Sequence, residues 1–97
     1  MMTRDDILAT IRANEPRLLE LSVREISLFG SFAREVDVTP TSDVDLLVEF
    51  DSTTFDNYMS VKELLESLFE RKVDLVIKSD IKPRLRERIL SEAIRAA

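Results

Sequence analysis

Apolar residues recur along this chain at two different spacings, which separates candidate helices from candidate strands. Spacings of three and four residues predict amphipathic helices over 3–13, 54–69 and 83–95. Thr3 and Asp6 resemble a capping box at the start of the first helix. Pro16, followed by several leucines, predicts a further helical turn before the first strand. Tyr58 lies on the apolar stripe of the long central helix, so we expect it in the core.

Runs rich in valine, isoleucine and leucine predict three strands, over 24–29, 44–50 and 72–78. The order is then helix, helix, strand, strand, helix, strand, helix. This order predicts an α/β (α+β) fold in which a small mixed sheet of about three or more strands is covered by helices. A chain of 97 residues without repeats or a linker fits one domain, residues 1–97.

Composition narrows the chemistry that this domain can perform. The chain contains no histidine and no cysteine, which excludes Ser/His/Asp and Cys/His catalysis and the usual zinc ligands. A formal net charge of −5 repels a phosphate backbone, so nucleic acid is not expected as the main partner. No run approaches the roughly 20 apolar residues that span a bilayer, and no signal peptide is evident. We therefore expect a cytoplasmic protein without a membrane partner.

Three aspartates are candidate metal ligands. Asp43 and Asp45 stand at the entrance of the second strand, two residues apart, so their side chains project to the same side. Like charges this close repel one another unless a hard divalent cation such as Mg²⁺ lies between them. Asp74 interrupts the apolar third strand, and if that strand lies beside the second, the three carboxylates could hold two metal ions. The alternatives are a solvated strand entrance and, for Asp74, a strand end that faces water.

A second candidate site follows the first strand. Gly30, the only glycine of the chain, and Ser31 offer backbone N–H groups and a hydroxyl where a helix could begin, a place that favours phosphate oxygens. Arg34, one turn later, could add a guanidinium fork. The alternatives are an ordinary helix cap and, for Arg34, a surface ion pair with Glu35 or Asp37.

Together, Gly30-Ser31-Phe32-Ala33-Arg34 and Ser42-Asp43-Val44-Asp45-Leu46 resemble the signature of the polymerase-beta-type nucleotidyltransferase superfamily. More narrowly, the chain resembles the minimal nucleotidyltransferase (MNT) domains. The resemblance extends over nearly the whole chain, because its length, its first helices, its third strand and its closing helix match that family's plan. It implies the polymerase-beta-type fold for residues 1–97.

The resemblance also implies roles for the candidate residues. Gly30 and Ser31 would bind the triphosphate of ATP, Asp43 and Asp45 would ligate two Mg²⁺ ions, and Asp74 would complete one ion's shell and help to activate the acceptor hydroxyl. MNT proteins of this kind are antitoxins encoded beside HEPN-domain ribonuclease toxins, and they transfer AMP from ATP to a toxin tyrosine. The implied function is therefore a protein adenylyltransferase with a two-metal mechanism, which can form a hetero-oligomer with its HEPN toxin.

The chain departs from the family pattern at two points. Glu35 stands where family members usually have glycine after the arginine, and the loop from Phe32 to Ser42 is one residue longer than usual. Two alternatives follow: an inactive antitoxin that neutralises its toxin by binding alone, and nucleotidyl transfer to a small molecule.

Overall fold

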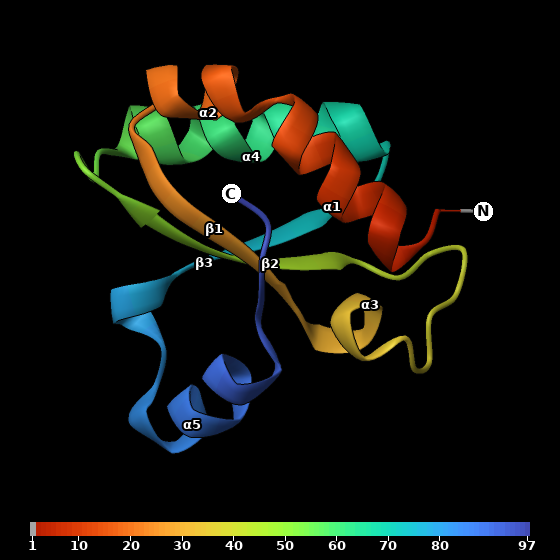
Figure 1. Cartoon of the computed structure of the whole chain (residues 1–97). Coiled ribbons are helices and arrows are strands. Elements are labelled where there is room, and N and C mark those ends of the chain that lie inside the picture. Colours follow the sequence, from red (N-terminus) through yellow and green to blue (C-terminus); the bar gives the residue numbers. More distant parts are fainter. Residues whose placement is uncertain (1) are drawn as a thin grey trace.

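Residues 2–97 are described by a computed structural model, and their strands form one mixed sheet (Figure 1). The strand order is β3-β2-β1-β4, with bounds β1 (Val23–Phe29), β2 (Val44–Phe50), β3 (Val73–Ile77) and β4 (Ile94–Arg95). β1 pairs antiparallel with β2 and β4, whereas β2 pairs parallel with β3. The predicted α/β fold with a mixed sheet is confirmed, and the parallel pairing places β3 directly beside β2.

The helices lie on both faces of this sheet. One face is covered by α1 (Arg4–Ala13), α2 (Glu15–Glu20) and α4 (Phe55–Phe69), and the other by α5 (Pro83–Glu92) (Figure 1). The short α3 (Gly30–Arg34) follows β1, and a 3-10 turn, η1 (Lys78–Asp80), follows β3. The predicted capping box of α1 is confirmed, since Thr3 and Asp6 each accept a hydrogen bond from the other's backbone N–H. Among residues 2–97, no helix has the length and apolar character to cross a membrane.

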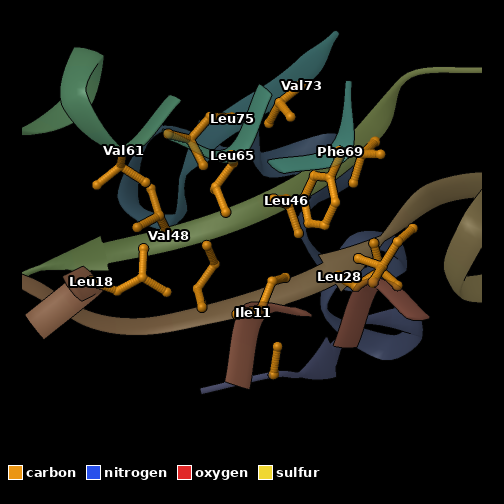
Figure 2. Packing of buried hydrophobic residues seen from close by; sticks show 14 of the residues in the cluster. Ile11, Leu18, Leu28, Leu46, Val48, Val61, Leu65, Phe69, Val73 and Leu75 are labelled. Atoms are coloured by element: carbon orange, nitrogen blue, oxygen red, sulfur yellow. The ribbon is translucent and has the colours of Figure 1, made fainter. Parts of the chain in front are cut away.

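The main core fills the space between the sheet and helices α1, α2 and α4. Figure 2 shows its side chains meeting from both sides, including the fully buried Leu28, Leu46 and Leu65. Each such side chain contributes about 1.5–3 kcal/mol through burial, which fixes β1 and β2 in one register. Tyr58 belongs to this layer as predicted, and its hydroxyl donates a hydrogen bond to the Leu75 carbonyl (2.6 Å).

A smaller apolar cluster attaches α5 to the opposite face of the sheet. It consists of Phe29, Leu47 and Ile81, with Val76, Ile89, Leu90 and Ala93 packed around them. No residue of α5 is fully buried, and even the apolar Leu85 is 37% exposed. The basic residues of this helix, Arg84, Arg86 and Arg88, are exposed. Because α5 has few buried contacts, this helix is held more weakly than the helices of the main core.

The predicted extent of the last helix is wrong. The helix ends at Glu92, and Ala93 is already extended (φ −67°, ψ 135°). Ile94 and Arg95 then pair with Leu28 and Ser27 as β4, and the Ala96 N–H donates to the Ile26 carbonyl (2.9 Å). The edge of β1 that does not face β2 forms backbone hydrogen bonds with this segment. This long-range pairing outweighs the helical spacing of the apolar residues that predicted a longer helix.

Glu35 occupies a backbone conformation that favours glycine. It ends α3 in the left-handed region (φ 57°, ψ 35°), where a side chain meets its own backbone. Its ion pair with Arg4 (3.1 Å) joins two partly exposed side chains and contributes little. We expect Glu35→Gly to raise the free energy of unfolding by about 0.5–1 kcal/mol. Urea denaturation measures this change; an unchanged or lower value would show that Glu35 is not strained.

Candidate active site

The candidate residues lie at one end of the sheet, where β1 ends and where β2 and β3 begin. In the β1–β2 register Phe29 is opposite Asp45, and in the β2–β3 register Asp45 is opposite Asp74. Asp43 immediately precedes β2, and Gly30 immediately follows β1. The fold therefore places all three aspartates at the same end of the sheet as the Gly30-Ser31 turn, although they come from segments up to 44 residues apart.

The three carboxylates form a strongly acidic group. Burial, together with the nearby Asp74 and Asp43 carboxylates, raises the pKa of Asp45 to about 6, although the positive charge of Arg34 acts in the opposite direction. Asp43 and Asp74 are both exposed. Asp74 therefore faces water, as one of the two alternatives predicted, and this exposure does not prevent it from binding a metal ion. Among the ion pairs of residues 2–97, none involves any of these aspartates. Their charge is therefore available to an external cation.

The donor set suits a magnesium ion, since it consists of carboxylate oxygens with no soft ligand among them. Asp45 and Asp74 lie on neighbouring strands in register, and the pKa of Asp45 shows that their charges repel. Within residues 2–97, no three acidic side chains are already gathered around one ion position. A bound cation would therefore have to draw the exposed Asp43 and Asp74 side chains toward Asp45 by changes of rotamer.

Gly30 is required at its position for two separate reasons. Its backbone turns through φ +76°, a region that favours glycine. A Cβ atom added at Gly30 would collide with the Asp45 carboxylate and lie 2.9 Å from Asp45 Cγ. The turn after β1 thus lies directly against the side chain of Asp45, so the backbone of Gly30 and the central carboxylate form one site.

Arg34 and Ser31 border the same site. A cavity of about 310 Å³ is lined by both residues together with Phe29, Gly30, Asp45, Leu85, Arg88, Ile89 and Glu92. Arg34 does not pair with Glu35 or Asp37; its Nη1 donates instead to both carboxylate oxygens of Glu92 (3.1 and 2.9 Å). Because α3 has only five residues, any anion site here depends on the Gly30 N–H and the Arg34 guanidinium and not on a long helix dipole.

Sequence reasoning missed the contribution of α5 to this cavity. Arg88 and Glu92, one turn apart on α5, both line it, and Leu85 and Ile89 add an apolar surface. The exposed Arg88 guanidinium makes no ion pair or hydrogen bond within residues 2–97. The only local signal was an i, i+4 pair of opposite charges at the end of a basic helix, a pattern that is usually no more than a surface pair.

Protons and a metal ion compete for Asp45. With a pKa of about 6, this carboxylate is mostly protonated at pH 5 and almost fully ionised at pH 7.5. The affinity for Mg²⁺ is expected to rise about 10-fold between these two pH values, in proportion to the ionised fraction. Calorimetric titration at both pH values measures it, with Glu87→Gln as a control that removes one exposed charge elsewhere. An affinity that does not change with pH would exclude Asp45 as a ligand.

The sequence of this chain matches a known protein family over most of its length. The family described as "Nucleotidyltransferase domain" matches residues 11–96. The protein adenylyltransferase MntA of Thermococcus cleftensis is 35% identical over 96 residues, which are 97% of this chain and 96% of that protein.

Several solved structures have a fold similar to that of this chain. A structure named as a candidate minimal nucleotidyltransferase is 37% identical, with a TM-score of 0.71 over 90% of this chain and 93% of the other. A toxin-antitoxin structure with AMP-PNP has a TM-score of 0.68 at 21% identity, covering 99% and 73%. The tri-AMPylated HEPN toxin of Shewanella oneidensis in complex with an MNT antitoxin has a TM-score of 0.58 at 19% identity, covering 89% and 71%.

Proposed function

Because the chain belongs to the nucleotidyltransferase domain family, we propose that it transfers AMP from ATP to a hydroxyl group of a partner protein, a HEPN toxin, and thereby acts as the antitoxin. The observation that carries the proposal is that Asp43, Asp45 and Asp74 lie at one end of the sheet, where Asp45 shares a cavity with Gly30 and Arg34. A carboxylate cluster next to a phosphate-binding turn is what nucleotidyl transfer requires. The name of the MntA relative and the AMPylated toxin among the similar structures support the choice of acceptor.

Each group of the site has a part in this reaction. The Gly30 N–H and the Arg34 guanidinium bind phosphate oxygens of ATP, and Leu85 and Ile89 offer an apolar surface beside them. Two Mg²⁺ ions held by the three aspartates would neutralise charge on the attacking and leaving oxygens. The acceptor oxygen bonds to the α-phosphorus, the bond from that phosphorus to the bridging oxygen breaks, and pyrophosphate leaves. In this proposal the Asp74 carboxylate, which is exposed, accepts the proton of the acceptor hydroxyl.

We infer that the acceptor is a tyrosine of the toxin. The aspartates Asp43 and Asp74 are exposed at the sheet edge, so a side chain that extends from another protein can reach them. A phenol is acidic enough to lose its proton to a carboxylate-lined site more readily than an aliphatic hydroxyl does.

Label transfer tests the proposal. The purified chain is incubated with the product of the neighbouring gene, MgCl₂ and ATP labelled at either the α- or the γ-phosphate. Transfer of α-label alone to the partner is the expected result. Transfer of γ-label would indicate a kinase, and a stable complex that silences the toxin without any label would establish the inactive antitoxin that neutralises by binding.

A further inference from the structure

The carboxylate of Glu92 accepts hydrogen bonds from the same donors, the Gly30 N–H and the Arg34 guanidinium, that would bind a phosphate group of ATP. The Gly30 N–H donates to Glu92 Oε1 (3.2 Å), and Arg34 Nη1 donates to Oε1 (3.1 Å) and Oε2 (2.9 Å). The Glu92 side chain is only 17% exposed, although it belongs to a surface helix. One acidic side chain therefore engages both the backbone and the side-chain part of the proposed phosphate site.

These contacts show that the turn after β1 binds an anion in the free chain. A carboxylate and a phosphate present similar oxygens to an N–H group and a guanidinium, and charge-assisted hydrogen bonds of this length are the strong kind. The two anions cannot occupy the same donors together, because their charges repel. Glu92 and a phosphate of ATP are thus competitors for Gly30 and Arg34.

The attachment of Glu92 allows such a competition. It is the last residue of α5, a helix without any fully buried residue, and the next residues continue into the two-residue strand β4. The cluster that holds α5 to the sheet contains three buried side chains, separate from the main core. Rotation of the Glu92 side chain away from Gly30 needs no change in the main core.

We propose that Glu92 is a resident anion that fills the phosphate site of the nucleotide-free protein and must leave the Gly30 N–H before a triphosphate binds. Glu92 then limits the affinity for ATP and keeps Arg34 in place until the nucleotide arrives. The inference rests on the proposed function for the identity of the ligand, but the exchange of anions at Gly30 is independent of any transfer of AMP. Arg88, one turn earlier on α5, lines the same cavity and has no ion pair among residues 2–97, so its charge is available to the incoming phosphates.

The chain offers a specific probe for this exchange, because Gly30 is its only glycine. Protein labelled with ¹⁵N-glycine gives one amide signal, which comes from the N–H that bonds to Glu92. Inorganic triphosphate without metal is titrated into the wild type, Glu92→Gln and the control Glu87→Gln, which alters an exposed residue of the same helix. We expect the Gly30 signal to move in all three proteins, at about 10-fold lower triphosphate concentration in Glu92→Gln.

The opposite result would overturn the inference. If Glu92 only braces Arg34, Glu92→Gln will need more triphosphate than the wild type; a Gly30 signal that never moves would show that no phosphate binds there. Should Glu92→Gln unfold, Glu92→Asp, whose carboxylate is one methylene shorter, is expected to change the titration in the same direction. Tighter triphosphate binding without AMP transfer in the label assay would leave the inference standing and remove the proposed function. If AMP is transferred but Glu92→Gln binds triphosphate more weakly than the wild type, the proposed function stands and the inference about Glu92 is wrong.

Discussion

Asp45→Asn is expected to reduce AMP transfer on the order of 10³-fold while leaving the fold intact. Asp45 is the central member of the acidic group, in register with Asp74 on one side and against Gly30 on the other. An amide keeps the size of the side chain but removes the charge that attracts a divalent cation. Initial rates of label transfer at saturating MgATP measure the loss. A variant that keeps more than a tenth of the wild-type rate would exclude the proposed role.

The same substitution is expected to leave thermal stability equal or higher at pH 7.5 without metal. The pKa of Asp45 in the folded chain, about 6, lies above its ordinary value of 3.8, so the folded state holds this proton more tightly than the unfolded state. The free energy of unfolding therefore falls as pH rises from about 4 to 6, and the whole penalty is present above that range. Asparagine carries no such charge. Lower activity with equal or higher melting temperature separates a functional carboxylate from a structural one.

Gly30→Ala is expected to damage both the fold and the site. An alanine at φ +76° costs about 1–2 kcal/mol of stability, and its Cβ displaces the Asp45 side chain. A displacement of this kind is expected to lower the transfer rate by about 10²-fold. Thermal melting and label transfer measure the two effects, with Ser31→Ala as a comparison that keeps the backbone path and the melting temperature. Full activity in Gly30→Ala would mean that the turn and Asp45 are not parts of one site.

Local spacing was sufficient to predict most of the elements of this fold. The stripe from Val61 to Leu65 and the run from Val44 to Val48 are each determined by burial on one face, and both were placed correctly. β4 could not be predicted, because Ile94 continues the helical spacing of α5 and becomes a strand only through its pairing with Leu28. Elements stabilised by distant partners leave no signal in a short window of sequence.

The candidate site divides in the same way. Asp43, Asp45 and the Gly30-Ser31 turn are recognisable because their residues are close in sequence, and the pairing of β2 with β3, which the sequence left open, brings Asp74 beside Asp45. Glu92 is 62 residues from Gly30, and nothing in its own helix indicates which donors it contacts. The left-handed backbone conformation of Glu35 also could not be predicted from the sequence. Glutamate rarely adopts a positive φ, so a glutamate at this position suggests a different loop path instead.

The mass of the partner protein decides whether this chain transfers AMP to it. The product of the neighbouring gene is analysed by intact-mass spectrometry before and after incubation with this chain and MgATP, and in parallel with Asp45→Asn. We expect the mass to increase by one or more whole AMP groups, located on a tyrosine by fragmentation, and not to increase with Asp45→Asn. A partner that keeps its original mass while it forms a stable complex with the wild-type chain would exclude AMP transfer as the function of this protein.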